Sequence, residues 1–183
     1  ENEFIRSFYY RVIYQTSIAN EFLRQANVFG KEEYSNLPTY RAEARFLRAL
    51  AYYHSLDMFG NGIPFTTEDD PIGAYQPMPA GEVYGPELFN YIESELLAIL
   101  GETEDKSEVL LDAKTAAIGR ADKGAGYMLL AKLYLNHEVY LKTKTDAYYT
   151  SALNLMNKLF AAGYRLIDDS DVANGDKFSA YEF

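Results

Sequence analysis

A pattern of small and large residues occurs twice in this chain, in residues 44–52 and again 82 positions later in residues 126–134. Small residues let two helices approach closely, and a large aromatic ring one turn later fills the adjoining gap. Antiparallel helix pairs stack in this way when a helical hairpin is repeated. The shared positions are Ala44, Phe46, Leu47, Ala49 and Tyr52 in the first copy and Gly126, Met128, Leu129, Ala131 and Tyr134 in the second.

Apolar residues at helical spacing predict five helices, over residues 4–26, 38–59, 86–100, 122–136 and 145–162. Almost no stretch alternates with a period of two, so we expect no sheet. The sequence therefore predicts an all-α, tetratricopeptide-like fold in which antiparallel helix pairs form a right-handed superhelix. The first helix should pair with the second, and the third with the fourth.

The same periodicity predicts which side of each helix is apolar. Little chain follows the fifth helix, so we expect its apolar side to be left without a partner in these residues. The predicted apolar positions are Ile5, Phe8, Val12, Ala19, Phe22, Leu23 and Ala26 in the first helix, Leu88, Ile92, Leu96 and Ile99 in the third, and Leu153, Leu155, Leu159 and Phe160 in the fifth.

Residues 60–85 separate the second helix from the third. They hold many of the chain's proline and glycine residues, together with the acidic run at 68–70. Such a composition is typical of a long exposed loop.

Charge and composition limit the partners of the chain. Seventeen Lys and Arg residues against 27 Asp and Glu residues give a formal charge of −10, which repels nucleic-acid phosphates and anionic lipids. No cysteine is present, so these residues hold no disulfide, thiolate metal site or lipid-bearing cysteine. We find neither a run of about 18 apolar residues nor a signal-peptide start. Because the helical pattern begins almost at the first residue and no stop signal follows the last, we expect a piece of a longer protein.

Two long stretches carry a family resemblance. Residues 40–53 read YRAEARFLRALAYY and are followed by DMFG at 57–60 and IP at 63–64. Residues 119–125 read GRADKGA, and residues 129–135 read LLAKLYL. These stretches resemble the AEARFLRA-x-x-Y…FG…P and GRA-x-K…LLA-x-x-YL segments of the SusD/RagB family.

Two shorter stretches extend the resemblance. Residues 19–22 and 162–166 stand where that family has I-x-x-x-N and G-x-Y-x-L. Gly126 departs from the pattern, since alanine is commoner there, and residues 101–119 have no feature that matches. The four ordered stretches cover most of the chain.

The resemblance implies a surface-exposed lipoprotein of the cell outer membrane that binds oligosaccharides or other nutrients and caps a SusC-like, TonB-dependent transporter. The lipid anchor and the C-terminal half of such a protein would lie outside these residues. The matched positions should have structural roles. They are Glu43, Arg45, Phe46, Arg48, Ala49, Tyr52, Gly60, Arg120 and Asp122.

Arg41, Arg45 and Arg48 form a basic stripe at helical spacing that could hold an acidic ligand. We favour a structural role, in which they pair with glutamates of a neighbouring helix or bond its terminal carbonyls. Arg120 has the same interpretation, and Asp122 is the expected N-cap of the fourth helix.

Hydrolysis of a glycoside would need a pair of carboxylates. The local candidates are Glu93 with Glu95, Glu102 with Glu104, and the acidic run at 68–70. Side chains one or two positions apart on a helix point in different directions, and acidic clusters in an acidic protein are usually solvated. We therefore expect no catalysis.

Neither histidine belongs to a catalytic or metal motif, since His54 and His137 lie far apart and outside any HExxH pattern. Residues 168–176 are rich in oxygen ligands, but their glycine is misplaced for an EF-hand and no glutamate closes the loop. A polar turn explains this segment, so we expect neither a metal nor a cofactor.

Sugars stack their apolar faces on aromatic rings while polar neighbours bond their hydroxyls. Most of the 17 tyrosines lie at helical spacing, where packing is the commoner role. Tyr75 and Tyr84 lie instead in the long loop, with Asp69 and Asp70 nearby, and are the candidate ligand contacts. Because the chain lacks tryptophan, the main sugar platform is expected outside these residues.

Three functions remain open from the sequence. Ligand capture at the cell surface, with this helical part as scaffold and docking surface, is the preferred hypothesis. A tetratricopeptide adaptor that binds peptides in a concave groove is the alternative, and a broad basic groove would favour it. A hydrolase is the third, testable by an activity screen on polysaccharides.

Overall fold

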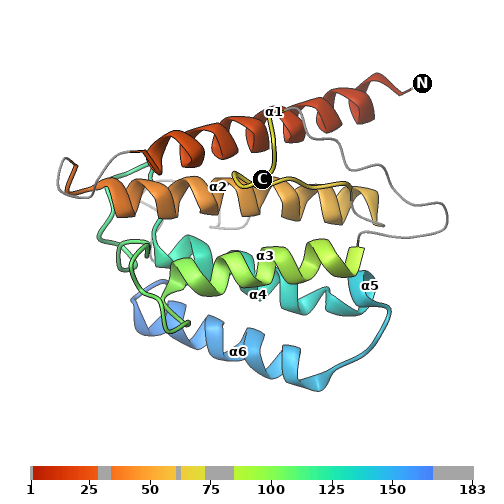
Figure 1. Cartoon of the computed structure of the whole chain (residues 1–183). Coiled ribbons are helices and arrows are strands. Elements are labelled where there is room, and N and C mark those ends of the chain that lie inside the picture. The colour runs from red at the N-terminus through yellow and green to blue at the C-terminus, as the bar shows by residue number, and fades with distance from the viewer. Residues whose placement is uncertain (1, 29–33, 61–62, 73–84, 167–183) are drawn as a thin grey trace, which may run out of the picture.

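The computed structural model describes residues 2–28, 34–60, 63–72 and 85–166. In this part of the chain six helices form and no strand (Figure 1), which confirms the all-α prediction. Each of the five predicted helices is present within one residue of its expected ends, and a short helix after the fourth was not predicted. The helices are α1 (Glu3–Ala26), α2 (Leu37–Phe59), α3 (Gly85–Leu100), α4 (Lys123–Leu135), α5 (His137–Leu141) and α6 (Asp146–Ala161).

Helix starts follow from local capping chemistry. The Asn2 side chain accepts hydrogen bonds from the first amides of α1, and Asp122 caps α4 in the same way. Asn36 precedes α2 without a side-chain capping bond, so proline in the first turn is the main start signal there. Gly60 ends α2 with a φ of 65°, a conformation that glycine adopts without strain.

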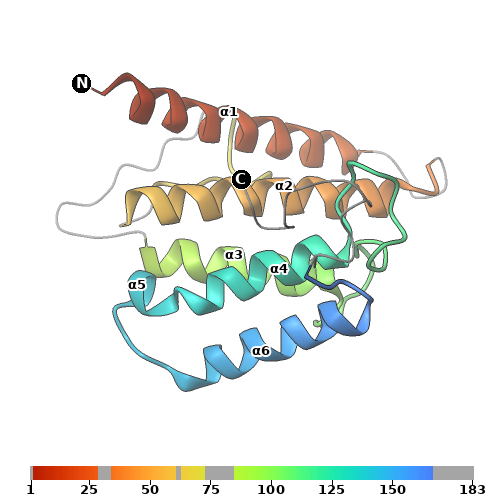
Figure 2. The same cartoon turned by 180° about the vertical axis from the view of Figure 1, so that it is seen from behind.

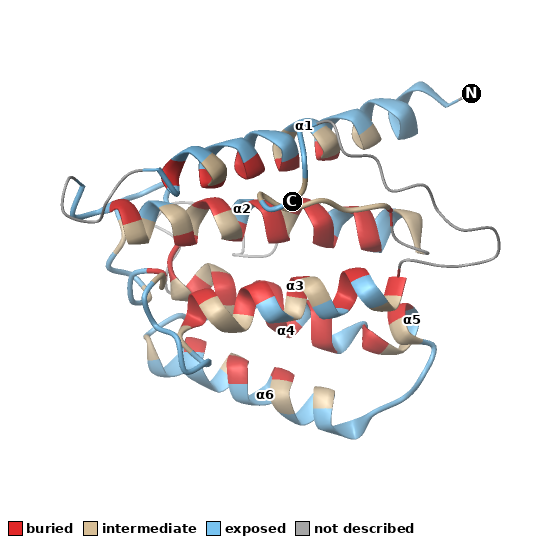
Figure 3. Ribbon diagram, viewed as in Figure 1, coloured by how far each residue is buried: buried red, intermediate tan, exposed pale blue. Residues whose placement is uncertain are grey.

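The long helices run alternately up and down, each packed on the next (Figures 1 and 2). α1 packs on α2, α2 on α3, α3 on α4, and α4 on α6. The expected pairs are therefore present, and they continue into a single stack compatible with a tetratricopeptide-like superhelix. α1 and α6 are the outer helices, and buried residues concentrate between them (Figure 3).

α3 is the centre of the core. Its four predicted apolar positions are all 0% exposed, which confirms the predicted face. Burial of side chains of this size stabilises the fold by about 1.5–3 kcal/mol each. The helix has neighbours on both sides, so its buried surface is wide.

The predicted apolar face of α1 is partly wrong. Ile5 and Phe22 are 51% and 40% exposed. α1 has apolar residues on two sides but packs against α2 on only one, so its outer side stays uncovered. The buried positions are Val12, Thr16, Ala19, Asn20, Leu23 and Ala26.

The expectation for the last helix is also partly wrong. Leu155 and Leu159 of α6 are buried, because they lie one turn apart on the side that packs against α4. Leu153 and Phe160 lie on another side and are 62% and 53% exposed. Only part of the apolar surface of α6 therefore lacks a partner within the described residues.

Residues 63–72, which we call the strap, were expected to be exposed. The strap instead lies against α1 and α2, with Ile63 only 4% exposed. The Tyr52 hydroxyl donates to the Thr66 carbonyl at 2.7 Å and accepts from the Thr66 amide at 3.0 Å. Asn20 donates to the same carbonyl at 3.0 Å. These bonds replace hydrogen bonds to water, so the strap backbone can be partly buried although its composition predicted exposure.

Candidate functional site

Three arginines on one face of α2 meet glutamates from three other segments. Their spacing of four and three residues aligns them on that face. The resulting arginine cluster consists of Arg41, Arg45, Arg48, Glu68, Glu95 and Glu108. Three positive and three negative charges leave the cluster neutral. It joins α2 to α3, to the strap and to the connection before α4.

Arg41 and Arg45 are the two less deeply buried arginines of the cluster. Arg41 Nε donates to Glu108 at 2.6 Å, and its Nη1 donates to the Leu23 carbonyl in the last turn of α1 at 2.9 Å. Arg45 donates to both carboxylate oxygens of Glu95, at 2.8 and 3.2 Å. Charge-assisted bonds of this kind also fix the orientation of the partners.

Arg48 is the deepest member, with only 2% of its side chain exposed. Its guanidinium donates to Glu95 at 2.8 Å, to Asn20 at 2.7 Å, and to Glu68 of the strap. Burial alone would lower the pKa of Arg48, but Tyr91 and the two glutamates outweigh it and raise the pKa. Arg48 therefore stays charged and links four segments at one point.

Glu95 responds in the opposite sense. Burial alone would raise the pKa of its carboxyl, but hydrogen bonds and charge from Arg45 and Arg48 lower it. Because both oxygens are bound by arginines, Glu95 is an ion-pair partner. Glu68, expected to be solvated, is likewise paired with Arg48.

Arg120 and Glu43, two further positions of the family resemblance, form an ion pair with each other. Arg120 donates to both carboxylate oxygens of Glu43 at 2.9 and 2.6 Å and lies 4.8 Å from the ring centroid of Tyr40. The pair ties the connection before α4 back to α2. Two residues later, Asp122 caps α4 through the Ala125 amide.

His137 is fully buried where α5 begins. The Thr145 amide donates to its Nε2 at 2.9 Å, so the proton lies on Nδ1, which donates to the Tyr134 carbonyl at 2.7 Å. The ring holds the turn into α6. Within the described ranges, no three histidine or acidic side chains come together to hold a metal ion.

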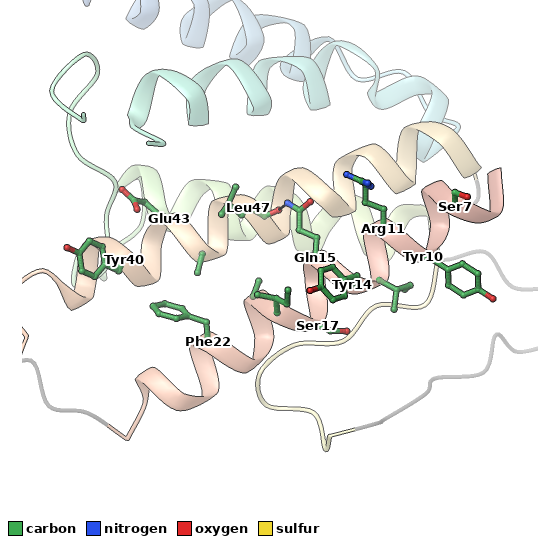
Figure 4. Close-up of a pocket in the computed structure, with 14 residues that line it drawn as sticks. Ser7, Tyr10, Arg11, Tyr14, Gln15, Ser17, Phe22, Tyr40, Glu43 and Leu47 are labelled. Atoms are coloured by element: carbon green, nitrogen blue, oxygen red, sulfur yellow. Dashed lines mark hydrogen bonds between the residues drawn. The ribbon is translucent and has the colours of Figure 1, made fainter. Parts of the chain in front are cut away.

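An aromatic groove lies between α1 and α2, with a volume of about 1320 Å³ (Figure 4). Four of its residues follow at four-residue steps along the outer face of α1. They are Tyr10, Tyr14, Ile18 and Phe22, exposed by 62%, 69%, 52% and 40%. The four-residue step is visible in the sequence. Helical tyrosines were expected to pack in the core, so these exposed rings were not predicted as a surface.

The groove is mostly apolar. Figure 4 shows Arg11 toward one end and Glu43 toward the other. Glu43 is already paired with Arg120, and Gln15 donates to the Leu47 carbonyl at 3.1 Å. The groove can therefore bury apolar surface, and it is not the basic groove that would suit an acidic peptide.

A second hollow, the strap pocket, lies between α1 and the strap, with a volume of about 500 Å³. Its base is polar and its walls are apolar and aromatic. We call the buried polar lining residues Thr16, Asn20 and Tyr52, with the partly buried Thr66, the base; the apolar and aromatic ones, Tyr9, Tyr10, Ile13, Pro64, Pro71 and Ile72, the walls; and the remaining polar ones, Ser17, Glu21, Arg24 and Thr67, the mouth.

Of the sequence-predicted ligand contacts, Tyr75 and Tyr84 lie outside the described residues. Asp69 and Asp70 are described but line neither hollow. The Asp70 carboxylate accepts from the Thr67 amide at 2.7 Å, so it shapes the strap.

Antiparallel helices stacked in sequence order, joined by a neutral ion cluster and hollowed on two sides of α1, define a tetratricopeptide-like helical scaffold. The chain is 36% identical over 161 residues to the starch-binding protein SusD of Bacteroides thetaiotaomicron. It belongs to the SusD-like family. The match covers 86% of this chain and 25% of that protein, so the chain spans about a quarter of its relative. No protein-family model matches the chain. None of the described helices is long and apolar enough to cross a membrane.

Proposed function

We propose that the whole protein is a glycan- or nutrient-binding component of an outer-membrane uptake complex, exposed at the cell surface and held there by a lipid anchor outside these residues. It would pass its ligand to a SusC-like, TonB-dependent transporter, without catalysis. Residues 1–183 would be its tetratricopeptide-like helical region, serving as scaffold and docking surface. The observation that carries this proposal is the match to a starch-binding relative over 86% of the chain.

The use of the charged side chains supports a scaffold. Arg45 is paired with Glu95, Arg48 with Glu68 of the strap, and Arg120 with Glu43. These residues hold segments together, so their chemistry is architectural. The large aromatic groove leaves an apolar surface on which another protein could dock.

The direct test uses the full-length protein and a panel of neutral polysaccharides in affinity electrophoresis and calorimetry. We expect binding of at least one glycan, co-purification with an outer-membrane barrel transporter, and removal of the protein from intact cells by external protease. No binding across the panel, or release of shortened sugars from a bound polysaccharide, would contradict the proposal.

Asp69, Asp70, Tyr75 and Tyr84 are proposed as ligand contacts of the segment that joins α2 to α3. Tyr75→Ala should weaken glycan binding by the full-length protein if its ring is a stacking surface. Tyr34→Ala, outside that segment, is the matched control. Equal affinity of the two variants for the glycan would remove Tyr75 from the site.

A peptide-binding adaptor is the second candidate, favoured by the aromatic groove. Amphipathic helices bind in such grooves through apolar residues at spacings of three and four. A fluorescent amphipathic helical peptide should then bind the full-length protein, and Tyr14→Ala should weaken it. Peptide binding without any glycan binding would replace the first proposal with this one.

A further inference from the structure

The strap pocket combines two kinds of surface that a sugar ring requires. Its base carries the hydroxyls of Thr16 and Thr66 beside the Asn20 amide. The amide already bonds Thr66 and Arg48, so the two hydroxyls are the groups that can take a further hydrogen bond, Thr16 as an acceptor and Thr66 as a donor. Its walls offer the rings of Tyr9 and Tyr10 beside aliphatic side chains. A pyranose has apolar C–H faces and a rim of hydroxyls, so it can meet both surfaces at once. The larger aromatic groove has no comparable buried polar base.

The charges at the pocket mouth favour a neutral ligand. Glu21 and Arg24 are ion-paired at 2.6 Å, so neither presents an uncompensated charge. Arg24 also donates to the Asp70 carbonyl at 3.1 Å. A charged ligand would have to lose water without gaining an unpaired counter-ion, whereas a hydroxyl can add to the carboxylate that Arg24 already holds.

The pocket is formed before any ligand arrives. Thr66 is bonded to Tyr52 and Asn20, and Glu68 is paired with Arg48, so the strap is held along its length. A volume of about 500 Å³ lies in the lower part of the range for small-molecule sites. A rigid pocket of this size suits one or two sugar rings, because little conformational entropy is lost on binding.

We infer that the strap pocket binds one end of a neutral saccharide, with a ring against Tyr10 and its hydroxyls toward Thr16, Thr66 and Glu21. The ligand class rests on the proposed function, but the site does not. It is a small site on the scaffold itself, away from the loop tyrosines. It adjoins the aromatic groove, with which it shares Tyr10, Ile13 and Ser17.

Isoleucine methyl signals report the site directly in the full-length protein. Ile72 lines only the strap pocket, Ile18 lines only the aromatic groove, and Ile118 lines neither. In a titration with maltose or cellobiose we expect saturable shifts at Ile72, with Ile18 and Ile118 unchanged. The charged sugar glucuronate should bind more weakly than either.

A matched pair of variants separates the pocket from the groove. Tyr10→Ala should weaken the response of Ile72 by roughly two- to tenfold, the range expected for loss of one aromatic contact. Tyr14→Ala removes a similar exposed ring one turn away that lines the groove and not the pocket. It should leave the titration unchanged. Both rings are more than half exposed, so both variants should fold.

The outcomes distinguish this inference from the proposed function. Polysaccharide binding by the full-length protein without any shift at Ile72 overturns the strap pocket and leaves the proposed function standing. A saturable shift at Ile72 that Tyr14→Ala weakens as much as Tyr10→Ala also overturns the pocket. Absence of all glycan binding overturns both. Saccharide binding at Ile72 in a protein that never reaches the cell surface supports the pocket and overturns the proposed function.

Discussion

α2 and α4 share one residue pattern, but they bury opposite chemistries at the same position. Counting 82 residues on from Arg48 leads to Leu130, and the two are 2% and 1% exposed. The flanking pairs behave alike, since Ala49 and Ala131 are both buried and so are Tyr52 and Tyr134. The repeat therefore predicts that this position is buried, but not whether a paired arginine or an aliphatic side chain occupies it.

The difference shows what the buried arginine adds. Taking a guanidinium out of water costs free energy, and replacing a buried ion pair by apolar residues is often neutral or stabilising. A leucine could fill the space in α2 as Leu130 does in α4. It could not pair with Glu68, so the strap would lose one of its bonds to the helices. At this position α2 combines packing with a tether, whereas α4 only packs.

The two helices differ again at the apolar pair. Phe46 is 7% and Leu47 is 47% exposed in α2, whereas Met128 is 43% and Leu129 is 4% exposed in α4. α4 contacts α2 as well as its hairpin partner α3, and Lys132 Nζ of α4 lies 5.5 Å from the ring centroid of Tyr53 in α2. Leu47 lines the aromatic groove instead. Neighbours therefore decide which member of the pair is covered.

The strongest test of the comparison gives α2 the residue that α4 has. Arg48→Leu should lower the free energy of unfolding by about 3–5 kcal/mol, because it removes the arginine paired with Glu68 and leaves Glu95 with Arg45 alone. Chemical denaturation measures the loss. Arg48→Leu combined with Glu68→Gln should recover part of it, and full stability in the single variant would show that the ion pairs are dispensable.

A second test compares the apolar pair directly. Leu129→Ala should destabilise by about 2–5 kcal/mol, as expected for a fully packed leucine. Leu47→Ala at the matching position should change stability by no more than about 0.5 kcal/mol, because its side chain is half exposed. Thermal melts of the two variants give the comparison. Equal losses would mean that the groove is covered in solution.

A third test uses the feature that the two helices share. Ala49→Trp and Ala131→Trp should each destabilise by about 1–3 kcal/mol or more, since both alanines lie where helices touch. Ala161→Trp, at an exposed position near the end of α6, is the control and should have little effect. An unchanged melting temperature in both core variants would contradict the shared packing.

The smallest expected effect is on the acid sensitivity of the ion pairs that α2 makes with Glu95. The pKa of Glu95 is lowered below its ordinary 4.5 in the folded protein, so its ion pairs stabilise the fold fully above that pH. This stabilisation is lost as the pH falls below about 4.5 through the folded-state pKa. Glu95→Gln should therefore show a shallower decline in denaturation midpoint with acid. An unchanged slope would mean that Glu95 is not the group that titrates.

The sequence alone determined the five long helices and the buried face of α3. Helix ends follow from caps, prolines and glycines within a few residues, and the face of α3 follows from periodicity over a few turns. Both signals are local, so the bounds agree to within one residue. The matched stretches also identified the family, because a family motif depends only on the order of the residues and not on their positions in space.

Only the tertiary structure decided which charged side chains pair with each other and which helix faces stay exposed. Nothing local relates Arg48 to Glu68 or Arg41 to Glu108, since these pairs depend on how the connections fold back over the helices. Whether the tyrosines of α1 face solvent depends in the same way on which neighbours cover that side. Periodicity gives the direction of a side chain around its own helix axis, but its burial is set by surfaces that come from distant parts of the chain.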